Sequence, residues 1–359
     1  MYVTLSHAVP FGAVPAWLCA VFSHGGAAVD VFFALSGFVI ARSWEAHRAD
    51  PRRFFAARVR RIYPAYLCVL LLAIPVQLIP LPLGDLPWAE RAAGEIWSGE
   101  FPPHGLIVLA LHLLMAHGVV PDGLLPHAWI GWLGAAWSLS TEWQFYLLVA
   151  CVGPHLGRGR RFALRLTLLL LCVAALGFAY DQVTPPGWHF SRAFLPEKAG
   201  HFALGVASAG AFAQRPARWW LVLLALAVCI ACGIHGGSGK AVPPVLWVAC
   251  LLVQRWPSAP ILRAPTRVLG SACALQLGAI SFSLYLVNIP VQKLLGVALA
   301  WLAAGNAHIF TLAWLPLAIA LPLAAAVLLH TWVEEPWRRP SRPGAGVGLE
   351  GPHAGVAQW

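Results

Sequence analysis

Residues 26–44, GAAVDVFFALSGFVIARSW, decide the fold class of this chain. A helix of this length can cross the hydrocarbon core of a bilayer, which is roughly 30 Å thick, and the stretch is almost entirely apolar. The basic stretch EAHRADPRRFFAARVRR (45–61) follows, and a second apolar stretch begins at Ile62. This order of apolar, basic and apolar segments predicts two membrane helices joined by a cytoplasmic loop.

The composition of the whole chain extends this prediction. Of the 359 residues, 59% are hydrophobic and only 11% are charged, and the mean hydropathy is +0.71. Soluble domains carry about 25% charged residues, so a soluble globular protein, a disordered chain and a secreted disulfide scaffold are excluded. A transmembrane β-barrel would show short segments of alternating polarity, and these do not dominate the sequence. We therefore expect an all-α, polytopic membrane helical bundle of about ten transmembrane helices. They are predicted near 1–22, 26–44, 62–82, 128–152, 162–180, 194–213, 217–235, 241–256, 275–302 and 309–333.

The basic residues indicate how these helices are oriented. Of the 24 Lys and Arg residues, all but Arg91, Arg192, Lys198, Lys240 and Lys293 lie in alternate connections or after the last predicted helix. Cytoplasmic loops of membrane proteins carry such an excess of positive charge, so both termini are predicted to be cytoplasmic. The net charge of +10 is explained by this orientation and requires no nucleic-acid partner.

The longest outer connection, 83–127, differs from the others. It is acidic and contains several histidines, but their spacing does not match that of metal ligands, so we expect no metal site. Its apolar part, 105–119, is too short for a confident span, and we interpret it as a re-entrant or interfacial segment. We expect one integral membrane domain over 1–340 and a disordered cytoplasmic tail over 341–359.

Ionisable side chains within the predicted helices need a specific reason, because each charge costs roughly 2.5–3.5 kcal/mol in the bilayer centre. The candidates are His7, Asp30, Glu142, Glu197 and Lys293. We interpret Glu197 and Lys293 as structural residues, at a helix start and at a helix interface. Asp30 is expected about one turn below the outer surface, and Glu142 near the middle of the membrane.

The neighbours of Glu142 favour a cavity over a lipid-facing surface. Glu142 lies in AWSLSTEWQFYLL (136–148), where Trp137, Ser138 and Tyr146 make the segment polar and aromatic. Such a segment is tolerated at membrane depth when it faces the interior of the bundle.

His7 titrates near neutral pH, so it can act as a base in one step and as an acid in the next. Asp30 lies on the next predicted helix after a short turn, and a His7–Asp30 pair is possible. The carboxylate would then hold the tautomer of the imidazole and stabilise its protonated form. The alternative is that His7 is only a structural hydrogen-bonding residue.

Arg58 and Arg61 are three positions apart and share one face of a helix. Two guanidinium groups on one face can bind phosphate or diphosphate. The alternative is that both arginines only anchor the cytoplasmic side of the membrane helix.

Five segments together resemble the acyltransferase-3 family of integral membrane O-acyltransferases. They are VDVFFALSGFVI (29–40), RVRRIYPAY (58–66), WSLSTEWQFYLL (137–148), ISFSLYLVNIPV (280–291) and EEPWRR (334–339). The resemblance implies transfer of an acyl group, most often acetyl, from cytoplasmic acyl-CoA to a hydroxyl group. Acyl-CoA would be a co-substrate, and no cofactor would be bound permanently.

The resemblance also assigns residues. The catalytic histidine of the family corresponds to His7, its R-x-x-R pair to Arg58 and Arg61, and its glutamate in the fourth helix to Glu142. The family signature G-V-x-x-F-F-x-x-S-G-F corresponds to 28–38, with Ala28 in place of glycine. The family histidine usually follows an arginine about eleven positions upstream, and residue 1 lies six positions before His7.

The last part of the family pattern, S-Y-S-x-Y-L-x-H, ends here in Asn288 in place of histidine. Asn288 can keep a polar contact but cannot titrate. Together with Ser36, Trp137, Ser138, Tyr146 and Tyr285, it is expected to line the substrate site.

The resulting hypothesis is an enzyme of the bacterial inner membrane. Arg58 and Arg61 would bind acyl-CoA, His7 with Asp30 would activate the acceptor hydroxyl or accept the acyl group, and Glu142 would orient the acceptor or relay a proton. The expected acceptor is a cell-surface glycan. The alternatives are a lipid, a small molecule such as a macrolide sugar, or a transporter that uses the same polar groups as a solute path.

Overall fold

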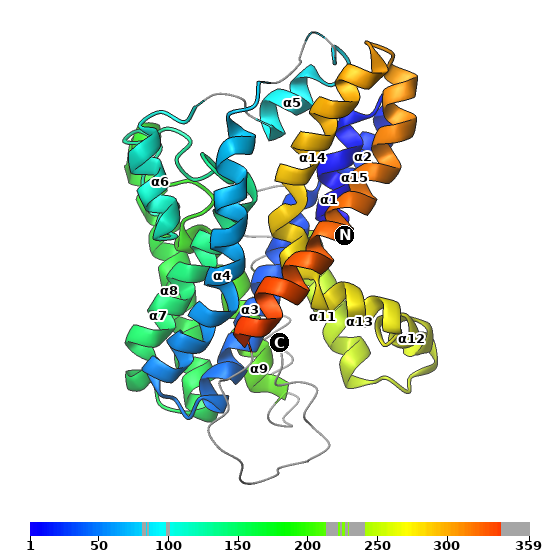
Figure 1. Cartoon of the computed structure of the whole chain (residues 1–359). Helices are drawn as coiled ribbons and strands as arrows, with labels where there is room; N and C mark the ends of the chain where they lie inside the picture. Colours follow the sequence, from blue (N-terminus) through cyan, green and yellow to red (C-terminus); the bar gives the residue numbers. More distant parts are fainter. Residues whose placement is uncertain are drawn as a thin grey trace.

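The computed structural model describes residues 1–80, 84, 86–97, 101–212, 222, 225, 226, 229 and 241–338, and all regular elements in these ranges are helices (Figure 1). The N-terminal α-helices are α1 (Tyr2–Ala8), α2 (Ala16–Phe22), α3 (Gly25–Ala46), α4 (Pro51–Gln77), α5 (Glu90–Ile96) and α6 (Gly105–Leu113). The middle of the chain forms α7 (Trp137–Leu156), α8 (Gly159–Val183), α9 (Leu195–Phe212) and α11 (Val242–Arg255). The last part forms α12 (Arg263–Leu269), α13 (Ala272–Ala279), α14 (Ser281–Ala303), α15 (Ala307–Leu329), a π-helical turn (His330–Glu334) and α16 (Glu335–Arg338).

The helical class of the fold is confirmed, but the expected number of about ten spans is not. In the described ranges, five helices are long and apolar enough to cross a membrane, or six if the bent pair Val242–Arg255 and Pro260–Leu269 forms one span. The helices α7 and α9 are not among them. They are 20 and 18 residues long, but polar side chains such as Ser138, Glu142 and Ser208 are buried along them. These two helices therefore form part of the protein interior.

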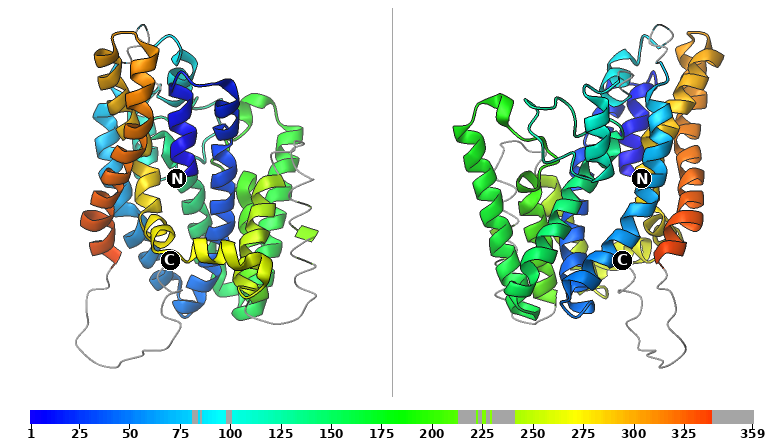
Figure 2. Two further views of the ribbon diagram at one scale, coloured as in Figure 1. Left: turned by 90° about the vertical axis from the view of Figure 1, so that its right-hand side faces the viewer. Right: turned by 60° about the vertical axis from the view of Figure 1, so that its left-hand side comes forward.

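The predicted first helix, 1–22, is broken in the structure. It consists of α1, a 3₁₀ turn (Val9–Phe11) and α2, which begins after Pro15. Pro10 and Pro15 interrupt the helix because proline lacks the N–H donor of a continuous helix. Met1 lies about halfway along the bundle, away from the end where α3 meets α4 (Figure 2). The predicted span 217–235 and the predicted tail 341–359 lie outside the described residues, apart from four isolated positions of the former.

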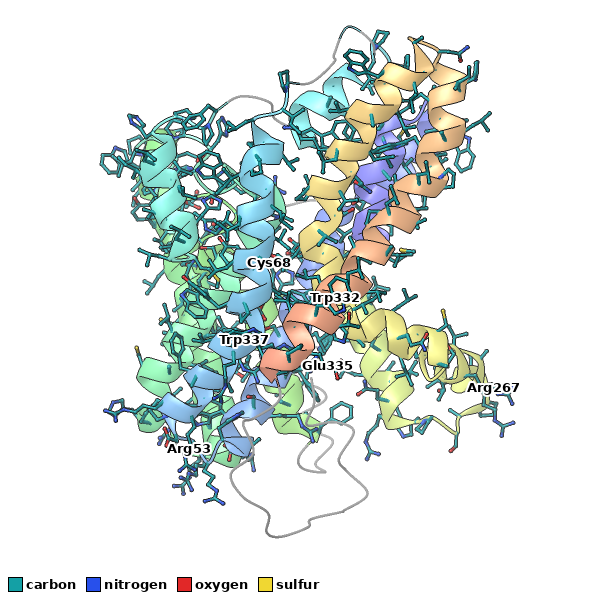
Figure 3. The ribbon with its side chains drawn as sticks, viewed as in Figure 1. Arg53, Cys68, Arg267, Trp332, Glu335 and Trp337 are labelled. Carbon is teal, nitrogen blue, oxygen red and sulfur yellow. The ribbon has the colours of Figure 1, made fainter. Side chains whose placement is uncertain are left out.

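The helix α4 begins eleven residues before the predicted start, at Pro51 rather than Ile62. Asp50 caps it, with Oδ1 accepting hydrogen bonds from the backbone N–H groups of Arg52 (2.9 Å) and Arg53 (3.1 Å). The basic segment predicted as a loop is therefore the first three turns of a helix. Arg53 marks this end of the bundle in Figure 3, where α3 ends and α8 begins.

The helix α7 begins at Trp137, nine residues after the predicted start. A 3₁₀ turn (Gly134–Ala136) precedes it, and Gly131 and Gly134 in the preceding segment lower its helical propensity. As a consequence, Glu142 lies in the second turn of α7 rather than near the middle of a longer helix.

The outer connection contains two short helices. The helix α6 has nine residues and is roughly 14 Å long, which is too short to cross a bilayer. It leaves Leu106 and Ile107 exposed. Its insertion as a re-entrant segment remains a prediction.

The helices α3 and α9 cross in backbone contact. A Cβ atom on Gly37 would lie closer than 3.0 Å to the carbonyl oxygen of Phe202, and one on Gly205 would meet the carbonyl oxygen of Ala34 in the same way. Small residues at such a crossing allow two membrane helices to approach closely. The crossing fixes which face of α3 is turned toward α9.

This crossing gives a prediction for stability. Gly37→Ala should destabilise the protein by about 2 kcal/mol or more, because the added methyl group would overlap the backbone of α9. Gly26→Ala is the matched control on the same helix, since a Cβ atom there would meet nothing within 4 Å. Thermal unfolding of the purified variants in detergent would measure both effects, and equal midpoints for the two variants would contradict the predicted overlap.

Candidate active site

The helix α14 connects the polar groups of the bundle. The Tyr285 hydroxyl accepts a hydrogen bond from Ser138 of α7 (2.8 Å), and Asn288 lies 2.9 Å from His7 of α1. Farther along α14, the amide of Gln292 donates to the carbonyl groups of Thr4 (3.2 Å) and Ala318 (2.9 Å). In a helical bundle such interhelical hydrogen bonds satisfy polar groups that have no access to water.

The first part of the candidate site surrounds Glu142, whose side chain is buried. Its Oε1 atom accepts hydrogen bonds from the Ser36 hydroxyl of α3 (2.6 Å) and from the Tyr146 hydroxyl one turn later on α7. A carboxylate that accepts two such hydrogen bonds is held in one orientation. The structure therefore brings together Ser36, Glu142 and Tyr146, which the sequence analysis proposed independently.

Arg58 and Arg61 face the same cluster from α4. The Arg58 side chain is only 8% exposed and lies beside Tyr146, and both arginines are within electrostatic reach of Glu142. Arg60 between them is exposed. A residue that only anchors the helix to the membrane surface would be solvated, as Arg60 is, so simple anchoring does not explain Arg58.

The second part of the candidate site is the His7–Asn288 pair. The Asn288 side-chain nitrogen lies 2.9 Å from His7 Nδ1, and the Asn288 side chain is fully buried. An asparagine amide offers both donor and acceptor atoms, so it can fix either tautomer of a neutral imidazole. With its oxygen turned toward Nδ1–H, it would leave Nε2 unprotonated and able to accept a proton.

The predicted His7–Asp30 pair is not formed in the structure. Asp30 Oδ1 instead accepts a hydrogen bond from Lys198 Nζ of α9 at 2.8 Å, with both side chains largely shielded from water. The reason lies in the helix crossing: Asp30 is seven residues, about two turns, before Gly37, so both lie on the face of α3 that packs against α9. Asp30 therefore pairs with α9, and Asn288 takes the place at His7.

Three further groups were not assigned from the sequence. Glu334 is buried and holds Ser283, His330 and Arg338. Arg192 lies over the rings of Trp129 (5.1 Å) and Trp137 (5.7 Å), and the Lys198 ammonium lies 5.9 Å from the Trp137 ring. The signal for Glu334 was present in EEPWRR, where an acidic residue directly follows an apolar helix. No sequence spacing indicates the contacts of Arg192, because they depend on how its loop folds.

The two remaining charged residues, Lys293 and Glu197, lie at a helix interface and at a helix start, as interpreted from the sequence. Lys293 is buried and donates a hydrogen bond to the carbonyl group of Gln77 (3.2 Å), at the end of α4. Glu197 lies in the first turn of α9.

Buried polar residues that link apolar helices around a histidine and a carboxylate indicate a functional site inside a membrane protein. The family model described as "Acyltransferase domain" matches residues 1–332, so this chain belongs to the acyltransferase-3 family. It is a multi-pass membrane acyltransferase.

Two characterised relatives are similar to the chain. The acyltransferase MdmB of Streptomyces mycarofaciens is 30% identical over 356 residues, which cover 88% of this chain and 81% of the relative. The O-acetyl transferase of Shigella phage Sf6 is 29% identical over 179 residues, which cover 48% of each chain. No solved structure matches the chain.

The contact between Ser36 and Glu142 can be tested by a double-mutant cycle. Ser36→Ala should destabilise the protein by about 1–3 kcal/mol, because it removes a hydrogen-bond donor from a buried carboxylate. In a Glu142→Gln background the same substitution should cost less, because the charge that needs the donor is gone.

Thermal unfolding midpoints of the four proteins would measure this coupling. Ser43→Ala is the control on α3, because the Ser43 hydroxyl lies 3.3 Å from Nδ1 of His47, one turn later in the chain, and not beside a buried carboxylate from another helix. Additive effects of Ser36→Ala and Glu142→Gln would show that the two side chains do not interact as described.

Proposed function

We propose that this enzyme transfers an acetyl group from cytoplasmic acetyl-CoA to a hydroxyl group of a cell-surface glycan, at the inner membrane of a bacterium. The observation that carries the proposal is the placement of His7 and Glu142. One helix, α14, contacts His7 through Asn288, and it contacts the segment of α7 that contains Glu142 through Tyr285. An imidazole and a buried carboxylate are thus held on one framework within an acyltransferase fold.

The donor is proposed to enter from the end of the bundle where α3 ends and α4 and α8 begin (Figure 1). These three helices carry arginines at this end, among them Arg42, Arg53 and Arg160. The excess of basic residues at this end supports a cytoplasmic orientation. Arg58 and Arg61 would bind the phosphate groups of acetyl-CoA, since guanidinium groups form strong charge-assisted hydrogen bonds with phosphate. The pantetheine arm would then extend between the helices toward α14.

In the proposed reaction His7 acts as a general base. Its Nε2 atom removes the proton from the acceptor hydroxyl, and the oxygen attacks the carbonyl carbon of the thioester. When the C–S bond breaks, the thiolate of CoA takes the proton from His7 and leaves as the free thiol. Asn288, with its amide oxygen turned toward Nδ1–H, keeps the imidazole in the required tautomer and orientation.

The acceptor would approach from the opposite end of the bundle, past Trp129 and Trp137. The indole N–H of Trp129 is buried and has no hydrogen-bond partner among the described residues, so it can donate to an oxygen of a bound molecule. Glu142, Ser138 and Tyr285 would orient the acceptor near His7. The name O-acetyl transferase of the phage relative supports a hydroxyl acceptor.

The catalytic role of His7 is tested by transfer of labelled acetyl from acetyl-CoA to an acceptor glycan by the purified protein. His7→Ala should lower the rate about 10²- to 10⁴-fold, the usual contribution of a general base. His24→Ala is the control, because His24 is exposed and directly precedes α3. Undiminished transfer by His7→Ala would refute this function.

The role of Asn288 is tested by comparing two variants. Asn288→Leu keeps the volume but removes the hydrogen bond to His7, so kcat should fall at least about tenfold while KM for acetyl-CoA changes little. Asp30→Asn should lower kcat less, because Asp30 contacts Lys198 instead of His7. A larger loss of kcat for Asp30→Asn would show that Asp30, and not Asn288, orients the imidazole.

A further inference from the structure

A second buried carboxylate, Glu334, lies at the π-helical turn between α15 and α16. Its side chain is 1% exposed. Oε2 accepts a hydrogen bond from the Ser283 hydroxyl of α14 (2.9 Å) and lies 2.9 Å from His330 Nδ1, and Oε1 accepts from Arg338 Nη1 at 3.4 Å. Single π-helical turns within α-helices occur frequently at functional sites. The turn fixes Glu334, and Glu334 in turn fixes Arg338.

Arg338 belongs to a segment that packs against the arginine-bearing helix α4. The π-helical turn and α16 both pack against α4, and Arg338 lies within electrostatic range of Arg61. Arg61 is also within range of Arg58. The three arginines come from two distant parts of the sequence and form a cluster in which Arg61 is within range of each of the other two. The like charges of these neighbouring groups repel.

Two observations indicate that this cluster is arranged for a ligand. The Nε atom of Arg58 is buried and has no hydrogen-bond partner among the described residues, although a buried charged donor is costly without one. The second observation is the accumulation of positive charge, since Arg338 and Arg61 are within electrostatic range of each other and a bound anion would offset their repulsion. Glu335 adds a half-buried carboxylate near Arg338, which balances charge at the edge of the cluster.

We propose that Arg338, positioned by Glu334, joins Arg58 and Arg61 in a three-arginine site that binds phosphate groups of the acyl-CoA donor. The proposal rests on the proposed use of CoA. It adds a donor-binding residue from the C-terminal end of the described chain. The site would bind the diphosphate or the 3′-phosphate of CoA, because these carry the negative charge that three guanidinium groups can share.

The experiment measures the affinity of the full-length protein, in nanodiscs of zwitterionic lipid, for CoA, 3′-dephospho-CoA and pantetheine. Arg338→Ala should weaken CoA binding about tenfold or more, as expected for the loss of a charge-assisted hydrogen bond. Its effect on pantetheine, which has no phosphate, should be absent. A merely structural role of Arg338 would instead lower the affinity for all three ligands alike, and that result would overturn the proposal.

The control is Arg53→Ala, on the same helix as Arg58 but with a solvent-exposed side chain paired with Asp50. Equal affinities of Arg53→Ala and Arg338→Ala for CoA would refute the three-arginine site. Because Arg338→Ala leaves Glu334 with one partner fewer, Arg338→Lys serves as a second variant. It keeps the charge beside Glu334, and its affinity for CoA should lie between those of the wild type and Arg338→Ala.

Two other outcomes separate this proposal from its alternatives. If the wild-type protein does not bind CoA, the proposed donor is wrong and the three-arginine site falls with it. The second alternative is a site for a lipid headgroup. In that case added anionic phospholipid would lower CoA binding by the wild type, and Arg338→Ala would reduce this inhibition without changing the affinity for CoA itself. That result would overturn only the proposal for Arg338.

Discussion

The structure depends on hydrogen-bond donors for the carboxylates that are buried inside an apolar helical bundle. Glu142 and Glu334 are buried carboxylates, and each is held by hydroxyl donors from a neighbouring helix, Ser36 for one and Ser283 for the other. An unpaired charge at such depth would be expelled or neutralised, so the helices that supply the donors cannot be arranged independently. The polar contacts that make chemistry possible are therefore the same contacts that set the order of the helices.

The sequence predicted the parts of the fold that depend on composition. The apolar segments from 26–44 onward indicated an all-helical membrane protein. About ten spans are not confirmed in the described ranges, and the difference found there has a physical reason. Hydropathy only distinguishes apolar from polar segments. The helices α7 and α9 carry buried polar side chains, which other helices shield from lipid. The segment 1–22 is apolar enough to span, but Pro10 and Pro15 break its helix.

In the candidate site, too, local sequence predicted some features, while others depend on contacts between distant segments. Local motifs identified His7, Arg58, Arg61 and Glu142, and spacing along one helix correctly placed Tyr146 beside Glu142. The partner of His7 was predicted wrongly because it depends on the rotation of α3, which is set by a contact with α9 far away in the sequence. Asn288 was expected to line the substrate site and to be able to keep a polar contact, but its contact with the imidazole of His7 was not predicted.

The crossing of α3 and α9 also bears on how the protein can move. Two helices in backbone contact at glycine cannot slide past each other without first separating, so this pair, tied again by Asp30 and Lys198, behaves as one rigid wall. The contacts of α4, α14 and α1 with their neighbours are made by side chains such as Arg58, Tyr285 and Asn288 and not by glycine at a backbone crossing. Any opening that admits a bulky molecule must therefore occur by displacement of α1, α4 or α14 relative to that wall.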